Sequence, residues 1–440
     1  MFPFTSIKPI LTTSTSSPTS KSTNNRTKQE GQFSLIHIPL TLYASLLQPI
    51  LRILLPHGGP THTPLDPEGP LSGLSEDNKH HFLNISVTPL ECSIVCHVSW
   101  AQNVFAPLIS RLPPNQAKQC HISKDTYIVF SVNSAGMEAG QRVMDLTAPL
   151  AMAAIPIFFI TTYYTDFILV PSKDRQTVGA ALLERGFEFS ENESAYVVQV
   201  PNLNHAHAHS RIPSASSNES TGPPSTPPPS NVAELQIRTF KQLRKRGVVP
   251  FIEPDLHLVQ CSGKEILPDD SYHSHSNGNG YTNGHSHSQE NTFLSTIDPK
   301  FYIGLISALI TQPRFLSITL AQDDAPSLLL DKSLLWLFGN SIAGDVDGEL
   351  VPIFLDLGGL PLESTGIVCG VAGKLCEVER MGGGGGEHGD ENGAGERERE
   401  GEGGELSYLS TARAGAVILS KGGSVRALEA LGPLLETIEA

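Results

Sequence analysis

The sequence has few cysteines and no excess of basic residues. Its six cysteines include no C-x-x-C pair, so their spacing offers neither a zinc-finger pattern nor an evident disulfide framework. We therefore predict reduced thiols that serve mainly as small core residues. The formal net charge of −15 argues against a nucleic-acid-binding surface, which needs an excess of lysine and arginine.

Long uninterrupted hydrophobic runs are also lacking. The two most apolar segments, 33–55 and 147–170, are both broken by prolines and by polar or charged residues. A transmembrane helix needs roughly 20 consecutive, mostly apolar residues. The sequence therefore predicts no membrane span, and with no secretory signal peptide it predicts a cytoplasmic protein.

Catalytic motifs are the third absence. The segment 370–374 ends in Gly-Lys, but its glycine spacing differs from that of a P-loop and Leu375 replaces the hydroxyl residue that would follow. The segment 339–344 is one residue too long for a nucleophile elbow. No G-x-G-x-x-G follows a predicted strand. We therefore predict a protein that is not an enzyme, has no catalytic residues and needs no cofactor.

Several segments are too poor in apolar residues to offset the entropy of ordering them. We predict a disordered tail at 1–30 and a low-complexity linker at 201–290, with a short ordered piece near 231–262. Similar composition marks 56–80 and the Gly/Glu tract 381–405. The alternating histidines of the linker lack a fixed surrounding shell of hydrogen bonds, so we predict no metal site.

Between these segments, apolar patterns alternate between strand and helix. Strands are predicted at 33–38, 82–87, 93–98, 127–132, 155–161, 166–170, 292–296, 316–320, 327–331, 351–357, 406–410 and 415–419. Helices are predicted at 42–54, 135–153, 175–185, 300–310, 366–375 and 423–431. The order in the first half is that of a ferredoxin-like βαββαβ unit, and the second half repeats it.

Short, similar sequence segments recur in the same order in both halves. One such pair is Pro89–Val95 and Pro361–Val368. This agreement favours an internal duplication. The predicted fold class is α+β, with four tandem ferredoxin-like modules in two pairs joined by disordered linkers. The modules are predicted at 31–119, 120–200, 291–345 and 346–440, the last interrupted by 381–405.

One loop has the composition of a small-molecule site. Glu363–Ile367 precedes a predicted helix, whose first N–H groups can bind a carboxylate, and Gly366 would allow a ligand to approach the backbone closely. The alternative is an ordinary helix N-cap formed by Ser364 or Thr365. The sequence leaves both interpretations open.

The segments Ala148–Ala151 and Thr161–Val170 resemble the corresponding segments of the CASTOR family of cytosolic arginine sensors. Weaker similarity continues through 296–299, 357–361 and 366–368. That family consists of tandem ACT-domain proteins, related to the regulatory ACT domains of aspartokinases. The resemblance implies four ACT modules, an amino-acid ligand, and nutrient sensing in TOR signalling through a protein partner complex. It leaves a homodimer open.

The resemblance also implies a ligand site between the second and fourth modules. The residues that match are Asp145, Leu146, Glu363, Ser364, Thr365, Gly366 and Ile367, with Arg413 and Gly415 on the remaining wall. The family's guanidinium-binding aspartate falls on Gly415, and Arg413 adds a nearby cation. We therefore expect a neutral or acidic amino acid rather than arginine. The alternative is an ACT-domain scaffold with a degenerate pocket that acts by protein contacts alone.

Overall fold

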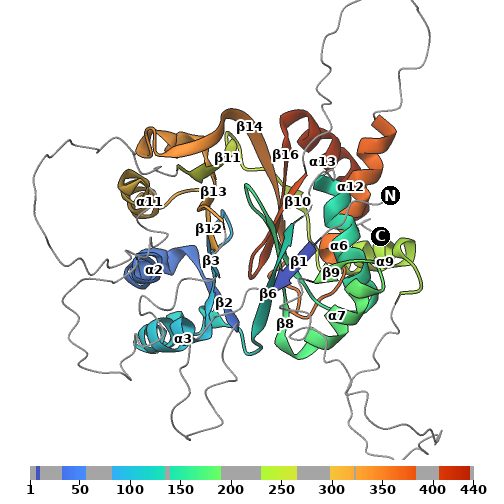
Figure 1. Ribbon diagram of the computed structural model, residues 1–440, viewed down its shortest axis with the longest axis horizontal. Coiled ribbons are helices and arrows are strands. Elements are labelled where there is room, and N and C mark those ends of the chain that lie inside the picture. Colours follow the sequence, from blue (N-terminus) through green and yellow to red (C-terminus); the bar gives the residue numbers. More distant parts are fainter. Residues whose placement is uncertain are drawn as a thin grey trace, which may run out of the picture.

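The computed structural model describes residues 6–9, 32–55, 82–133, 139–189, 229–264, 298–321, 324–382 and 406–436 (Figure 1). Most of the predicted tail 1–30, of the segment 56–80 and of the linker 201–290 lies outside these residues. The predicted strand at 292–296 and residues 383–405 of the Gly/Glu tract also lie outside them.

The strands form two layers that face each other (Figure 1). In order of pairing, the first half-sheet contains β2 (Phe33–Ile38), β4 (Cys92–His97), β3 (Phe82–Val87), β12 (Leu316–Ala321), β13 (Ser327–Asp331) and β11 (Leu258–Gly263). The second contains β14 (Ile342–Asp356), β16 (Ala414–Ser420), β15 (Ser407–Ser410), β7 (Phe158–Thr161), β8 (Asp166–Pro171) and β6 (Tyr127–Asn133). Four short strands extend them, namely β1 (Ser6–Pro9), β5 (His121–Ile122), β9 (Glu188–Phe189) and β10 (Pro250–Phe251).

The two half-sheets are joined along both edges. The long strand β14 pairs with β11 through its first part and with β16 through its second. At the opposite edge, β2 pairs with β6 at Phe33 and Tyr127. The path of strands therefore closes on itself, and the order strand, helix, strand, strand recurs in four stretches of chain.

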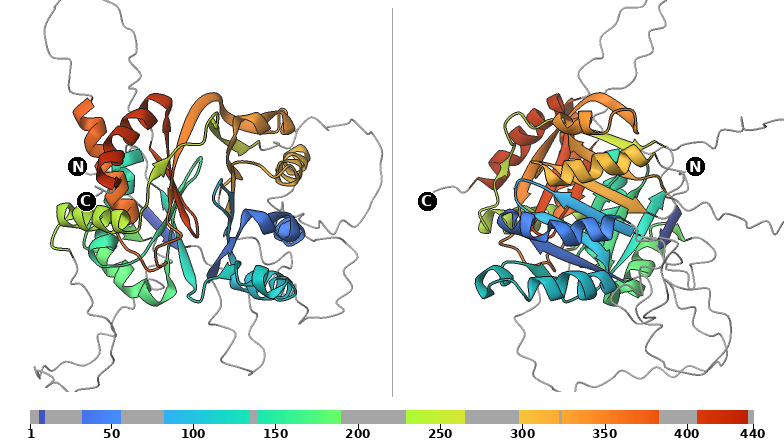
Figure 2. Two further views of the ribbon diagram at one scale, coloured as in Figure 1. Left: turned by 180° about the vertical axis from the view of Figure 1, so that it is seen from behind. Right: turned by 90° about the vertical axis from the view of Figure 1, so that its left-hand side faces the viewer.

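Helices cover the outer face of each half-sheet (Figures 1 and 2). Those of the first are α1 (Leu40–Tyr43), α2 (Leu47–Leu54), α3 (Val98–Trp100), α4 (Ala106–Ile109) and α11 (Pro299–Ile310). Those of the second are α6 (Ala139–Met152), α7 (Arg175–Leu183), α9 (Val232–Lys245), α12 (Ile367–Gly382) and α13 (Lys421–Leu435). The remaining short helical segments are η2 (Ala44–Leu46), the π turn η3 (Ala101–Phe105), α5 (Pro114–Ala117), η4 (Ser172–Asp174) and η5 (Lys332–Leu337).

This four-layer arrangement buries the strands on both faces. In β2, Phe33 and Leu35 belong to the central core between the half-sheets, whereas Ile36 and Ile38 pack under the outer helices. A strand buried on both sides has no solvent face and so forms a nearly continuous apolar run. That explains why β2, β3 and β13 lie at their predicted positions.

The ordered piece predicted near 231–262 contains α9 and β11. Its place in the fold was not foreseen: α9 packs on α12, and β11 pairs with both β13 and β14. The stretch 98–117 forms α3, the π turn, α4 and α5, although it contains three prolines. Proline is tolerated in the first turn of a helix, where its missing N–H has no partner to lose.

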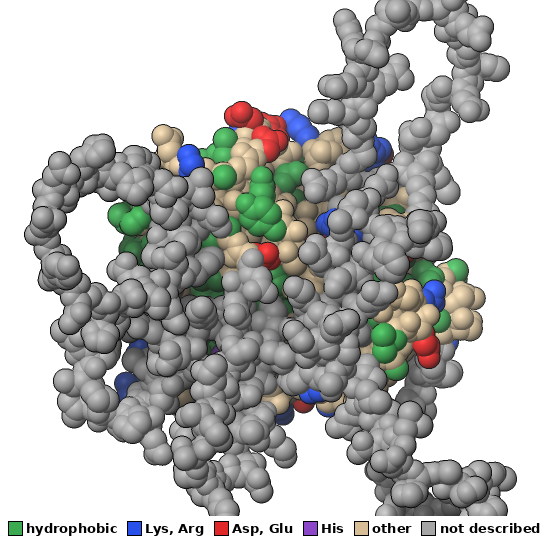
Figure 3. All heavy atoms as spheres, viewed as in Figure 1, with side chains coloured by type: hydrophobic (Ala, Val, Ile, Leu, Met, Phe, Trp, Pro, Cys, Tyr) green, Lys and Arg blue, Asp and Glu red, His purple; other side chains and the backbone are tan. Residues whose placement is uncertain are grey.

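Acidic side chains gather over β14 in the space-filling view (Figure 3), and Asp345, Asp347 and Glu349 are exposed on that strand. Within the described part of the chain, no helix is long and apolar enough to cross a membrane. All six cysteines are buried and unpaired, as predicted. Burial raises the pKa of the Cys369 thiol to about 11, so this group stays protonated at neutral pH.

The central core supplies the first test. Phe354 is fully buried there, with its ring centroid 5.5 Å from that of Phe251 and 6.0 Å from that of Phe315. We expect Phe354→Ala to lower the free energy of unfolding by about 3–5 kcal/mol, because it leaves a cavity between the half-sheets. Urea denaturation measures the loss. Ile237→Ala, at a side chain 69% exposed on α9, is the control and should change little. A small effect at Phe354 would contradict the packed central layer.

Candidate ligand-binding site

A small pocket lies where the second half-sheet is least tightly paired. β7 and β15 share one register pair, Leu409 with Ile160. On either side of it, hydroxyl oxygens take the place of backbone carbonyls. The N–H of Phe159 donates to Ser410 Oγ at 3.0 Å, and the N–H of Tyr408 donates to Thr161 Oγ1 at 3.0 Å. The pocket opens beside this seam.

The pocket has a volume of about 50 Å³ and no charged side chain in its wall. The loop 357–366 and the start of α12 form one side, and β7, β15 and the turn 411–414 form the other. Its hydroxyl groups belong to Ser364, Tyr408, Ser410 and Thr411. Such a wall suits a polar, uncharged group more than an ion.

The Tyr408 hydroxyl stands out because it has no hydrogen-bond partner among the described residues. Ser364 Oγ accepts from Gln242, Ser410 Oγ accepts from Phe159, and Thr411 Oγ1 donates to Glu91. Tyr408 is 1% exposed, and burial raises its pKa well above the ordinary value, so the hydroxyl keeps its proton. An unpaired buried hydroxyl costs about 1–3 kcal/mol. The pocket therefore holds a donor that a ligand or a water would satisfy.

Gly415 lies behind this tyrosine and not in the pocket wall. A Cβ atom added at Gly415 would lie 2.7 Å from Tyr408 Oη, closer than atoms approach without a shift. The space that a side chain at 415 would enter is therefore filled by Tyr408. Sequence reasoning noted the missing acid at 415 but did not find the tyrosine that replaces it.

Gly366 lies immediately before α12 and has a φ of +79°, a conformation that favours glycine. A Cβ there would lie 2.7 Å from Leu235 Cδ1 and 3.1 Å from Thr239 Oγ1, both on α9. The Thr239 hydroxyl also donates to the Gly366 carbonyl at 3.2 Å. The close approach that requires glycine is thus made by α9, although Gly366 also lines the pocket together with Ser364 and Ile367.

The other predicted residues are dispersed. Leu146 is buried in the core beneath the second half-sheet. Asp145 is half-buried, accepts from Gln141 Nε2 at 2.6 Å and does not line the pocket, and neither does Thr365. Glu363 is exposed and lines a larger cavity on the other side of its loop. The structure therefore brings together only part of the predicted set.

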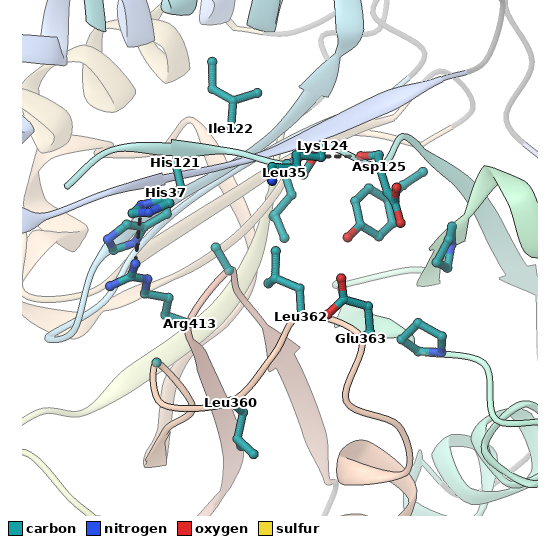
Figure 4. Close-up of a pocket in the computed structure, with 16 residues that line it drawn as sticks. Leu35, His37, His121, Ile122, Lys124, Asp125, Leu360, Leu362, Glu363 and Arg413 are labelled. Carbon is teal, nitrogen blue, oxygen red and sulfur yellow. Dashed lines mark hydrogen bonds between the residues drawn. The ribbon is translucent and has the colours of Figure 1, made fainter. Parts of the chain in front are cut away.

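Arg413 was expected beside the pocket as a repelling cation, and the structure corrects this. Its neighbours Ala412 and Ala414 line the pocket, but its own side chain lines the larger cavity, where Nη2 lies 3.4 Å from His121 Nδ1 (Figure 4). A tight turn sends successive side chains in different directions. An acidic ligand in the small pocket would therefore gain no counter-charge from Arg413.

A buried carboxylate holds this turn in place. Glu91 is fully buried between the half-sheets, and its Oε2 lies 2.5 Å from His37 Nδ1. Its Oε1 accepts from Thr411 Oγ1 at 2.6 Å and from the backbone N–H of Arg413. A buried carboxylate is tolerated when several donors satisfy it. Sequence reasoning missed Glu91, since its partners are 54 and 320 residues away.

Comparison with known proteins identifies one domain family. Residues 122–184 match the ACT domain, and ACT domains are generally regulatory modules that bind amino acids. The chain thus has mixed α/β content with a ferredoxin-like ACT domain. Comparison with curated proteins gives no match. Within the described ranges, no group of three or more histidine, cysteine, aspartate or glutamate side chains could hold a metal ion.

Two solved structures show distant likeness. A protein from Agobacterium tumefaciens is 16% identical, with 48% of this chain and 100% of that chain covered and a TM-score of 0.24. An aspartate kinase from Synechocystis is 9% identical, with 100% of this chain and 57% of the kinase covered and a TM-score of 0.27. Both scores are too low to support a conclusion about this chain.

The contact between Gly415 and Tyr408 can be tested by a double-mutant cycle. We expect Gly415→Ala to destabilise the fold by about 1–3 kcal/mol, because the new methyl group meets the tyrosine oxygen. Tyr408→Phe removes that oxygen, so the double variant should recover much of the loss. Urea denaturation of the four proteins measures the coupling. Strictly additive effects would contradict the contact.

Glu91 provides a second test. We expect Glu91→Gln to lower the free energy of unfolding by about 1–3 kcal/mol, because a neutral amide accepts more weakly and turns an N–H₂ group toward donors. Thermal or urea unfolding measures the change. Glu429→Gln, an exposed position on α13, is the matched control. Equal effects of the two variants would rule out the proposed role of the buried carboxylate.

Proposed function

We propose that the protein is a non-enzymatic regulatory protein that binds an α-amino acid in the pocket beside Tyr408. The observation that carries the proposal is the unpaired, buried Tyr408 hydroxyl in a wall of uncharged polar groups. The first turn of α12 adds backbone N–H groups that favour a carboxylate. The ACT match over residues 122–184 supports a ligand of this class.

The volume of the pocket indicates that binding involves movement. About 50 Å³ admits only a few water molecules, because one water needs roughly 10–15 Å³ measured in this way. An amino acid would fit only if loop 357–366 shifted outward. Gly358 and Gly359 are exposed in this loop, so it can move with little loss of buried contact. A ligand that favours one loop position would change the surface presented to a partner.

The uncharged wall favours a neutral side chain. With Arg413 directed elsewhere and Gly415 behind Tyr408, neither an acidic nor a basic side chain would find a counter-charge among the residues that line the pocket. Burying an unpaired charge is unfavourable. We therefore narrow the expected ligand to a neutral amino acid, with arginine disfavoured.

The resemblance to the CASTOR sensors suggests a cellular role for such a protein. By analogy, four ACT modules would report amino-acid supply to a protein partner complex in TOR signalling, in the cytoplasm, with a homodimer as one assembly. The second candidate is an ACT-domain scaffold whose pocket has degenerated. The small pocket volume and the cover that α9 places over Gly366 favour this candidate.

A thermal-shift screen of the twenty standard amino acids separates the two. A ligand at about a hundred times its Kd stabilises the folded state by ~2.7 kcal/mol, which raises the melting temperature by several degrees. We expect a neutral amino acid to give such a shift. Tight binding of arginine alone would contradict the proposed selectivity. No shift with any of the twenty would favour the scaffold.

The role of Tyr408 is tested by isothermal titration with the best ligand. We expect Tyr408→Phe to weaken binding about tenfold while leaving the unliganded fold as stable or more stable. Tyr302→Phe is the matched control, because the Tyr302 hydroxyl is also buried without a partner in the described part of the chain but lies under the other half-sheet. A loss of affinity in both variants would argue against a specific contact.

A further inference from the structure

A second cavity lies on the other side of loop 357–363. Its volume is about 410 Å³, within the range of roughly 300–1,000 Å³ that small-molecule sites occupy. Leu360, Leu362 and Ala412 line both this cavity and the small pocket. The remaining wall comes from β2, β5 and the start of β6, so the cavity lies at the edge where the two half-sheets meet.

One end of the cavity carries cationic and imidazole groups (Figure 4). The half-buried Arg413 forms no ion pair with any described carboxylate, and its Nη2 lies 3.4 Å from His121 Nδ1. The His37 ring lies 6.0 Å from that of His121 and is held by Glu91. Glu91 also fixes the backbone of Arg413. A guanidinium held in place without a counter-ion is a binding group for a carboxylate.

The other end carries Asp125 and Glu363 (Figure 4). Burial and the negative charges of these two groups raise the pKa of Tyr127, which also lines the cavity, to about 12. Asp125 pairs with Lys173 at 2.6 Å, but both side chains are exposed, so the pair is weak. Glu363 forms no ion pair with another described residue. Because Asp125 is already paired, Glu363 is the carboxylate at this end that a ligand cation would meet.

Apolar side chains separate the two ends. Leu35 and Leu362 lie between the Arg413 end and the Glu363 end in the close-up (Figure 4). Lys124 also lines the cavity and is exposed to solvent. A ligand that matches the wall would carry an anion at one end, a cation at the other and a flexible apolar or peptide spacer between them.

We propose that this cavity binds a linear zwitterion with its charges at opposite ends, such as an ω-amino acid or a short peptide. The carboxylate would contact Arg413 and His121, and the ammonium group would contact Glu363 and Asp125. An α-amino acid with a neutral side chain carries both charges on one carbon and cannot span the two ends. The proposal is therefore independent of the ligand proposed for the small pocket.

Isothermal titration with two series of linear zwitterions tests the proposal. The first series runs from β-alanine to ε-aminocaproate, and the second from diglycine to tetraglycine, which distinguishes an alkyl spacer from a peptide spacer. We expect affinity to rise with length to an optimum in at least one series. Hexanoate and hexylamine carry one charge each. We expect both to bind at least about tenfold more weakly than the best zwitterion. A single-charge compound that binds as well as the best zwitterion would overturn the proposal, as would silence from both series.

Variants assign the two ends. We expect Arg413→Gln and Glu363→Gln each to weaken binding of the best zwitterion about tenfold. The Glu363→Gln variant should bind the zwitterion no more tightly than hexanoate. The Arg413→Gln variant should bind the zwitterion no more tightly than hexylamine. Arg426→Gln, exposed on α13 and outside the cavity wall, is the matched control and should leave affinity unchanged.

The same titrations separate this cavity from the small pocket. Thermal unfolding of each variant confirms that it folds. Tyr408→Phe should leave zwitterion binding unchanged, whatever its effect on the affinity for α-amino acids. Zwitterion binding that survives both Arg413→Gln and Glu363→Gln, or that is lost in Tyr408→Phe alone, would show that the ligand lies elsewhere.

Discussion

The carboxylate of Glu91 ties the two halves of the molecule together at the place where both cavities form. It takes donors from β2 through His37 and from the turn between β15 and β16 through Thr411 and Arg413. Removing a carboxylate from water is costly unless hydrogen bonds and charge compensate it. Because these donors come from different half-sheets, the group is satisfied only when the halves are assembled. Its burial thereby fixes the turn against β2.

That turn divides the space around it. Thr411 and Ala414 line the small pocket beside Tyr408, Arg413 lines the larger, charged cavity, and Ala412 lines both. The loop 357–366 forms the other part of the dividing wall. Two chemically different cavities therefore share part of their walls. If a ligand moved loop 357–366, as proposed above, it would alter both cavities, which is the structural requirement for coupling between sites.

The small pocket itself is a consequence of incomplete strand pairing. β7 and β15 meet at one register pair, and side-chain hydroxyls of Thr161 and Ser410 satisfy the backbone N–H groups on either side. Tyr408 on β15 lines the pocket beside this seam, and its hydroxyl, which lies against Gly415, has no hydrogen-bond partner among the described residues. The closed strand path supplies the frame, and the site that we propose lies at the seam where neighbouring strands share one register pair.

Local sequence pattern was sufficient for most of the elements. Strands such as β3 and β13 are buried on both faces, so their apolar runs are visible without knowledge of their partners. The loop 363–367 was also recognisable, because a glycine before an apolar helical pattern has local meaning. The cysteines were correctly assigned to the core for the same reason. In each case the physical cause lies within a few residues of the feature.

Tertiary structure decided the chemistry of the sites. The partners of Glu91 are 54 and 320 residues distant, and the helix that requires glycine at 366 lies more than 120 residues earlier in the chain. The direction of Arg413 depends on how a tight turn is anchored, and the exclusion of a side chain at 415 depends on Tyr408 from the neighbouring strand. The sequence by itself determined which segments form strands and helices, since that choice rests on local backbone preference and apolar period. Which side chains meet in a pocket depends on contacts between distant segments, and those exist only once the half-sheets have packed.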